Sequence, residues 1–333
     1  MKTRSTLPAI LLSLAVSAIA HGAETTATRP GVAKINPSPG THAVPDYRAG
    51  LSFGKADRLP GVSSLAVGKD DFLVVAAGSK VFLYDPAKEQ SVRSFDTGFD
   101  NITAVAVEGG TIYVFSRKTE IKEMESNGRK YKRMIPVGAL CKTFAWDGTP
   151  TGSLELENLK DVINAKVADG IIYVADLGGT RTVRTFDART GKSVGSLGKD
   201  LRLCCGILDF ALDPKSGEVL IANLGAFKLE RYNKGGQLLS SFGERGEQPE
   251  SFQGCCNPVS AAVLPDGNLV VVQKDPSQVK IFSPSGKMLF PFKDVQELVK
   301  GCNHVSVAVD TQGRVYLGVN AGERFVLQYV PKA

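Results

Sequence analysis

The chain repeats one pattern three times, as Cys204-Cys205-Gly206-Ile207-Leu208-Asp209-Phe210-Ala211-Leu212, Cys255-Cys256-Asn257-Pro258-Val259-Ser260-Ala261-Ala262-Val263 and Cys302-Asn303-His304-Val305-Ser306-Val307-Ala308-Val309. In each copy a cysteine (Cys205, Cys256 or Cys302) precedes by six residues an alanine that lies within an apolar run. A glycine-containing turn and a second apolar run follow each copy. The chain therefore repeats a β-unit and places thiols at one fixed point of it.

From Tyr47 onward, short runs rich in β-branched and aromatic residues alternate with glycine, proline, aspartate and asparagine turns. Such runs are typical of strands, and one complete unit has four of them, at 165–167, 171–176, 182–187 and 193–198. The turn glycines Gly170, Gly217, Gly267 and Gly313 are 47, 50 and 46 residues apart. A four-stranded unit of this length indicates one blade of a β-propeller.

Two stretches resemble the repeat core of NHL-repeat β-propellers. The first is Ile172-Tyr173-Val174-Ala175-Asp176-Leu177-Gly178, followed by Val183-Arg184-Thr185-Phe186-Asp187. The second is Ser241-Phe242-Gly243-Glu244-Arg245-Gly246-Glu247-Gln248-Pro249-Glu250-Ser251-Phe252 with Asn257-Pro258. The resemblance covers roughly Arg48 to Tyr329 and is weakest in the first two units. It implies an all-β, six-bladed propeller.

The last blade has only three strands before the chain ends at Ala333. Gly50-Leu51-Ser52-Phe53-Gly54 is similar to Leu239-Ser240-Ser241-Phe242-Gly243, the outer strand of an earlier blade. We therefore predict that residues 47–333 form a six-bladed propeller in which an N-terminal strand closes the last blade, leaving no open sheet edge. The six blades are expected to begin after Gly61, after Phe99 and near Val162, Ile207, Val259 and Val305.

A 26-residue insertion, 117–142, interrupts the second blade and is basic in its first part, 117–133. Two interpretations are open. It is a solvated hairpin extension, as charged runs usually are, or it docks an anionic partner or lipid surface.

The N-terminus is typical of an export signal. Lys2 and Arg4 precede an apolar run that ends in a small-x-small cleavage motif at 18–20. Residues 1–20 are therefore expected to be removed, and 21–46 to form a disordered or surface tether. The apolar run is too short for a transmembrane span, so we expect a periplasmic or secreted protein in which disulfides persist.

The overall composition is that of an ordinary globular protein, with hydrophobic and charged fractions of 43% and 22%. The formal charge of +6 does not indicate nucleic-acid binding.

The cysteines are expected to meet at one end of the central channel. Five of the six lie in loops that join one blade to the next, and Cys141 ends the insertion between a second and a third strand, a loop that opens on the same face. The predicted mouth comprises Cys141, Cys204, Cys205, Cys255, Cys256, Asn257, Cys302, Asn303 and His304. Asp209, Ser260 and Ser306, aligned at the start of inner strands, are expected to line the channel beneath it.

Three arrangements of these thiols remain open. The first has vicinal disulfides, Cys204–Cys205 and Cys255–Cys256, with Cys141–Cys302 as a third bridge; such rings are strained. The second has cross-links between neighbouring blades, such as Cys205–Cys256 or Cys256–Cys302. The third binds a thiophilic metal, copper or zinc, with Cys302 and His304 as candidate ligands. Fifteen pairings exist for six cysteines, and spacing does not select one.

Two functions follow from these features. The favoured one is an exported binding or redox-associated scaffold that presents the mouth to a small molecule, metal or partner protein. The alternative is a metal-dependent propeller hydrolase or lyase. The sequence has no Gly-x-Ser-x-Gly motif and no glycine-rich phosphate loop between a strand and a helix. Whether the protein is an enzyme therefore stays open.

Overall fold

A computed structural model describes residues 46–274, 276–292, 295, 305–320 and 323–332. The predicted signal peptide and tether, together with Cys302, Asn303 and His304, lie outside the described residues. No helix among the described residues is long and apolar enough to cross a membrane.

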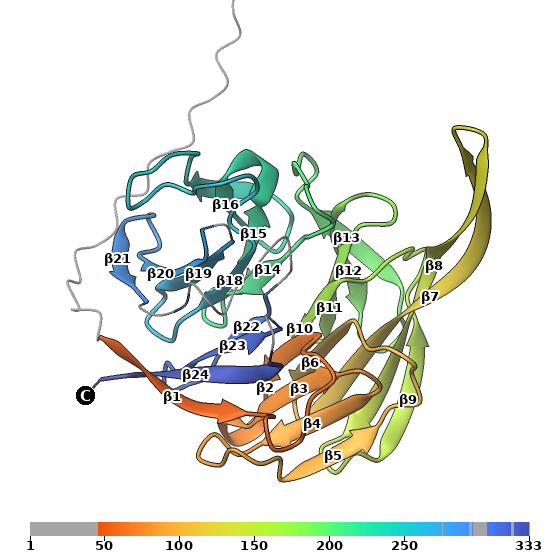
Figure 1. Cartoon of the computed structure of the whole chain (residues 1–333), viewed down its shortest axis with the longest axis horizontal. Coiled ribbons are helices and arrows are strands. Elements are labelled where there is room, and N and C mark those ends of the chain that lie inside the picture. The colour runs from red at the N-terminus through yellow and green to blue at the C-terminus, as the bar shows by residue number, and fades with distance from the viewer. Residues whose placement is uncertain (1–45, 275, 293–294, 296–304, 321–322, 333) are drawn as a thin grey trace, which may run out of the picture. The chain divides into compact units, whose positions relative to one another are not determined.

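The strands form six antiparallel, four-stranded sheets, the blades of a propeller (Figure 1). Blade 1 contains β2 (Ser64–Val67), β3 (Leu73–Ala77), β4 (Lys80–Tyr84) and β5 (Arg93–Asp96); blade 2 contains β6 (Ala104–Glu108), β7 (Thr111–Ser126), β8 (Arg129–Ala145) and β9 (Pro150–Glu155). Blade 3 contains β10 (Asn164–Ala168), β11 (Ile171–Asp176), β12 (Thr182–Asp187) and β13 (Ser193–Leu197).

Blade 4 contains β14 (Phe210–Leu212), β15 (Val219–Asn223), β16 (Lys228–Tyr232) and β17 (Leu238–Phe242); blade 5 contains β18 (Ser260–Val263), β19 (Leu269–Gln273), β20 (Gln278–Phe282) and β21 (Met288–Pro291). Blade 6 contains β22 (Val307–Val309), β23 (Val315–Val319), β24 (Phe325–Pro331) and β1 (Tyr47–Phe53). Two short 3-10 turns, Lys69–Asp71 and Leu224–Ala226, are the only helical segments in the described residues. The predicted six-bladed, all-β fold is confirmed.

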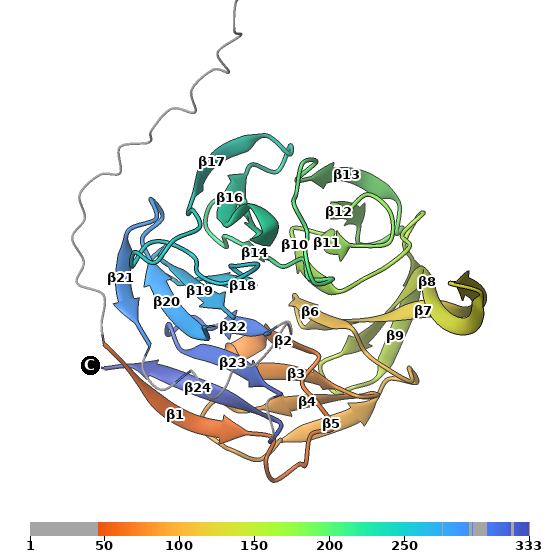
Figure 2. The ribbon, with the colours of Figure 1, turned by 45° about the horizontal axis from the view of Figure 1, so that its top comes forward.

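The first strands of the blades surround the centre of the ring. Each of β2, β6, β10, β14, β18 and β22 contacts the first strand of the next blade, and β22 returns to β2 (Figure 2). Burial follows this order: every residue of β15, β19 and β23 is buried, whereas four of the five residues of the outer strand β13 are exposed. Apolar second strands therefore form the core, and the first strands line the channel.

The two ends of the described chain meet in blade 6, as predicted. β1 pairs antiparallel with β24, from Tyr47 opposite Pro331 to Phe53 opposite Val326. Phe53 is fully buried, with its ring 5.5 Å from that of Tyr84 in blade 1 and 6.0 Å from that of Tyr316 in blade 6. The N-terminal strand therefore completes the sheet and fills the core between the first and last blades.

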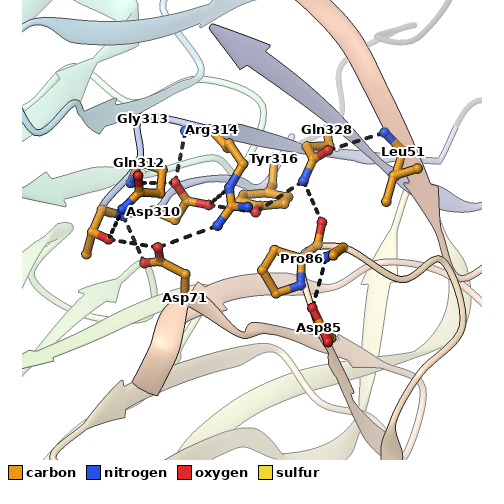
Figure 3. Close-up of polar contacts among 12 residues, drawn as sticks. Leu51, Asp71, Asp85, Pro86, Asp310, Gln312, Gly313, Arg314, Tyr316 and Gln328 are labelled. Carbon is orange, nitrogen blue, oxygen red and sulfur yellow. Dashed lines mark hydrogen bonds and ion pairs between the residues drawn. The ribbon is translucent and has the colours of Figure 1, made fainter.

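A polar network reinforces this seam (Figure 3). The Gln328 side chain accepts a hydrogen bond from Leu51 N of β1 at 3.3 Å, and it donates to Pro86 O of blade 1 at 3.1 Å. Asp310 accepts from Arg314 Nε and from the Tyr316 hydroxyl, the latter at 2.7 Å. Buried polar groups paired in this way fix the register of the seam.

The insertion in blade 2 is a continuous hairpin. β7 and β8 stay paired from Thr111–Ala145 to Ser126–Arg129, and the hairpin extends beyond the other strands (Figure 1). Asn127 and Gly128 at its tip both have positive φ, 52° and 71°, as a two-residue hairpin turn requires. All residues from Arg117 to Met134 are exposed. The insertion is thus an exposed hairpin, and docking of an anionic partner or lipid surface stays a prediction.

Candidate functional site

Four of the predicted mouth residues form one cluster. The sulfur atoms of Cys204, Cys205, Cys255 and Cys256 all lie within 4.8 Å of one another, and we call these residues the four-cysteine cluster. Their two loops lead into β14 and β18, the first strands of blades 4 and 5. Because first strands of adjacent blades lie side by side, the propeller brings together doublets that are far apart in sequence.

One disulfide links the two blades, between Cys204 and Cys256. Their Cα atoms are 6.3 Å apart, within the usual range for a disulfide. The predicted vicinal pairing is therefore wrong for both doublets, since Cys204 bonds to Cys256 and not to its neighbour. Adjacent Cα atoms are only about 3.8 Å apart across a trans peptide, so the partner on the next blade offers better geometry. The cross-link between blades is the arrangement found, with Cys204 in place of Cys205.

Two free thiols flank this bridge. Cys205 Sγ lies 3.3 Å from Cys204 Sγ, and Cys255 Sγ lies 3.5 Å from Cys256 Sγ. Cys205 and Cys255 are both exposed, whereas Cys256 is buried. Each end of the disulfide is thus in contact with a thiol that solvent can reach.

A tight turn presents Cys205. Cys204 and Ile207 form an antiparallel bridge, and Ile207 N donates to Cys204 O at 3.3 Å. The two residues between them, Cys205 and Gly206, have φ of 58° and 65°. A turn with two left-handed residues favours Asn-Gly, and a cysteine in this conformation is uncommon. The turn directs Cys204 toward blade 5 and leaves Cys205 at the exposed tip.

Amides at the ends of second strands hold both cysteine loops. Asn223 Oδ1 accepts from Arg202 N at 2.8 Å, two residues before Cys204, and Gln273 Oε1 accepts from Gln253 N at 3.2 Å, two residues before Cys255. The same structural role recurs in blade 6, where Asn320 pairs with Val62 N and O, both at 2.9 Å. These amides therefore position the loops.

Asn257 is a second anchor and not part of an open mouth. It is fully buried, and its amide donates to Gln253 O and to Lys274 O, both at 2.6 Å. Its Oδ1 accepts from Lys274 N at 2.8 Å. The expectation that Asn257 faces a ligand is wrong, because its side chain is used in fastening the loop to the end of β19.

Lys274 is a site residue that the sequence analysis missed. It is only 1% exposed, and its Nζ donates to Cys205 Sγ at 3.2 Å across the blade boundary. The signal was present in the repeat, since Leu177 and Leu224 follow the second strand at the same position in blades 3 and 4. A lysine where the repeat has leucine is buried at a cost in solvation free energy, and here its amine contacts the sulfur of an exposed cysteine.

Cys141 does not join the cluster. It lies within β8, opposite Phe115 and Leu154, and is fully buried among Ala104, Phe115 and the other apolar side chains between blades 2 and 3. Burial raises the pKa of its thiol. The prediction placed Cys141 at the end of a loop, but β8 continues through it, so its side chain enters the core and is inert.

The three predicted channel residues connect neighbouring blades. Ser260 Oγ donates to Val305 O, and Ser306 Oγ donates to Ser63 O at 3.2 Å. Asp209 accepts hydrogen bonds from the Asn164 amide and from Phe210 N, the latter at 2.9 Å. All three residues are buried. Asp209 and Ser306 line a narrow part of the channel with Lys166, whereas Ser260 is enclosed between blades.

Comparison with models of known protein families and with the sequences of curated proteins finds no match to this chain.

Proposed function

We propose that this protein is an exported, NHL-type propeller scaffold whose four-cysteine cluster exchanges disulfides with a small thiol compound or a partner protein. Export is supported by the signal-like residues 1–20. In a periplasmic or secreted setting thiol–disulfide chemistry is available to surface cysteines. The cluster lies on loops fastened to a rigid ring, the arrangement in which a scaffold usually carries its functional groups.

The observation that carries the proposal is a pair of exposed thiols, Cys205 and Cys255, whose sulfurs lie within 4.8 Å of each other beside the Cys204–Cys256 bridge. Exchange requires an attacking thiolate that the reaction partner can reach and a second thiol close enough to resolve the mixed disulfide. A bridge that serves only to stabilise blades 4 and 5 needs neither Cys205 nor Cys255. Both are present at 3.3 and 3.5 Å from the bridged sulfurs.

The exchange reaction uses Cys205 and Cys255 as a dithiol. The Cys205 thiolate attacks one sulfur of a disulfide RSSR, forming a mixed disulfide and releasing RS⁻. The Cys255 thiolate, within 4.8 Å, then attacks the Cys205 sulfur and releases the second RS⁻. In sum, two protein thiols lose two protons and two electrons, RSSR becomes two RSH, and a Cys205–Cys255 bridge forms. The reverse sequence oxidises a dithiol partner.

Lys274 is a positioning residue in this reaction. Its backbone N–H donates to the buried Asn257 Oδ1 at 2.8 Å, and its Nζ contacts Cys205 Sγ at 3.2 Å. The contact orients the sulfur of the exposed turn toward the cluster. Among the described residues, a lysine contacts the sulfur of Cys205 and none contacts that of Cys255. Cys205 is therefore the attacking thiol, and Cys255 resolves the mixed disulfide.

The test follows free thiols in the protein carrying the native bridge after addition of glutathione disulfide. We expect two thiols per chain to disappear and two molecules of reduced glutathione to be released, with a Cys205–Cys255 peptide found by mass spectrometry. Cys255→Ser should stop at a stable mixed disulfide on Cys205, and Cys205→Ser should react at least tenfold more slowly. Cys141→Ser, the buried control, should behave as the parent. Failure to form a Cys205–Cys255 bridge refutes the proposal.

A metal-binding function has one observation in its favour: four sulfurs that all lie within 4.8 Å of one another. With the disulfide reduced, four thiolates at about 2.3 Å would complete a tetrahedral zinc or copper(I) site. Such a site leaves no open position for a water molecule or substrate. A four-thiolate site of this kind could store or carry a metal ion, but it gives no support to the metal-dependent hydrolase or lyase alternative. Stoichiometric zinc on the protein purified without chelator, with no disulfide present, would favour this function over exchange.

A further inference from the structure

The central channel contains a cavity of about 500 Å³ at the end opposite the four-cysteine cluster. The cysteine loops precede the first strands, whereas the cavity is bordered by the residues that follow them, including Asp169 in blade 3 and Asp213 to Gly217 in blade 4. The cavity and the cluster are thus separated by the length of the first strands.

The cavity wall contains a ring formed by the same position of the first strand in every blade. Five of these residues are alanines and the sixth is a lysine: Ala66, Ala106, Lys166, Ala211, Ala262 and Ala308. The sequence carried this signal, because the alanine six residues after each repeated cysteine is the same position. Leu65, Val67, Val107, Leu212, Val263 and Val309 add further aliphatic surface. The ring and the aliphatic side chains beside it are therefore apolar apart from the Lys166 amine, whereas polar and charged residues, among them Asp213 and Lys215, border the outer part of the cavity.

Lys166 is placed at the inner end of this cavity. It lines both the cavity and the narrow part of the channel beyond it, where Asn164 and Asp209 lie. Burial lowers the pKa of Lys166, and the nearby Asp209 carboxyl acts in the opposite direction. Asp209 itself accepts hydrogen bonds from Asn164 and Phe210 N. The amine thus lies beside apolar side chains, and the Asp209 carboxyl that acts on it is hydrogen-bonded to other groups.

Of the other charged groups that line the cavity, both carboxylates are paired, and Lys215 is exposed to solvent. Lys234 Nζ contacts Asp169 at 2.6 Å, and Arg231 contacts Asp213 at 3.3 Å. Within the described part of the chain, the structure gives no ion pair for Lys166. Replacing the alanine of the repeat by a half-buried lysine costs solvation free energy, and the fold gains no ion pair from it. Groups retained at such a cost are expected at functional sites.

We infer that the channel binds a small aliphatic monocarboxylate, with its carboxylate on Lys166 Nζ and its alkyl chain against the alanine ring. A single lysine matches a single negative charge. A strongly hydrated divalent anion such as phosphate would lose its water against apolar walls without a second cation at the inner end. This site is independent of the thiol exchange proposed above, because it lies at the other end of the channel and contains no cysteine.

The test is titration calorimetry of the intact protein with straight-chain carboxylates from acetate to octanoate and with hexanamide. We expect affinity to rise with chain length by up to about fourfold per methylene group, and hexanoate to bind at least tenfold more tightly than hexanamide. Lys166→Ala, which installs the residue of the other five blades, should lose at least tenfold in hexanoate affinity. Lys166→Met provides a second variant of closer volume.

The matched control is Lys192→Met, which removes an exposed lysine in the turn between β12 and β13, outside the cavity. It should bind hexanoate as the parent does. Equal binding of hexanoate and hexanamide, unchanged affinity in both Lys166 variants, or no binding of any carboxylate at millimolar concentration would each overturn the inference. Thiol exchange is unaffected by all of these outcomes, so the two proposals fail separately.

Discussion

The ring is fastened at two places by different means. Between blades 6 and 1, where the ends of the described chain meet, β1 pairs with β24 and Phe53 packs between Tyr84 and Tyr316, with no covalent bond between the two blades among the described residues. Between blades 4 and 5, where the chain is already continuous, a disulfide joins Cys204 and Cys256. The covalent link is therefore not at the place where the ring can open.

This difference bears on why the cysteines are present. A bridge selected to close the ring would join the first and last blades. The observed bridge closes a loop of 52 residues between adjacent blades, which restricts the unfolded chain but does not hold the ends together. The two additional thiols contribute nothing to closure. The comparison thus separates a seam that maintains the fold from a cysteine cluster available for chemistry.

The largest effect is expected at the seam. Phe53→Ala should lower the free energy of unfolding by about 3–5 kcal/mol, because it leaves a cavity in a fully buried aromatic cluster. Deleting residues 46–53 should cost more, since it also exposes the edge of β24. Urea unfolding measures both changes. A truncated protein as stable as the parent would show that β1 does not close the ring.

A smaller effect is expected at the disulfide. Replacing both Cys204 and Cys256 by serine should cost at most about 4 kcal/mol, the chain-entropy value for a loop of this length, and the propeller should remain folded. Replacing both residues avoids leaving one unpaired thiol in the cluster. Urea unfolding and near-ultraviolet circular dichroism monitor stability and packing. Loss of the folded state in this variant, with Phe53→Ala still folded, would reverse the comparison and make the bridge the main fastening.

The periodicity of the sequence was sufficient to predict the fold, because each blade carries the same local pattern of apolar strands and glycine turns. The spacing of four turn glycines predicted the length of one blade, and the resemblance to NHL repeats predicted six blades. The similarity of 50–54 to 239–243 predicted the seam, which depends on the pairing of one strand. The convergence of the two cysteine doublets also followed, since the propeller places equivalent loops of neighbouring blades side by side.

The details of the site depend on contacts between blades that the sequence does not reveal. Which sulfur bonds to which depends on the Cys205-Gly206 turn, which directs Cys204 toward blade 5. The position of Cys141 depends on how far β8 continues, and a long hairpin has no sequence signal for its boundary with the blade. Lys166 and Lys274 were visible as departures from the repeat. Their importance became clear only when one was found in the channel and the other beside Cys205.

The smallest expected change in the free energy of unfolding is a stabilisation, and it comes from a substitution at Cys205. Cys205 has a left-handed backbone with φ of 58°, a conformation that costs an L residue about 1–2 kcal/mol and costs glycine little. Cys205→Gly should therefore raise the free energy of unfolding by up to about 1 kcal/mol, once the greater flexibility of glycine in the unfolded chain is included. Cys255→Ser, the matched exposed control without positive φ, should change it by less than about 0.5 kcal/mol.

Both values come from urea midpoints at constant m, under conditions that keep the Cys204–Cys256 bridge oxidised. A stabilised Cys205→Gly variant that no longer forms the bridge with Cys255 would show that the cysteine is kept at a cost to the fold. Destabilisation by this substitution would mean that the Cys205 side chain, through its contact with Lys274, supports the loop more than its backbone strains it. In that case the cluster would belong with the seam among the structures that maintain the fold.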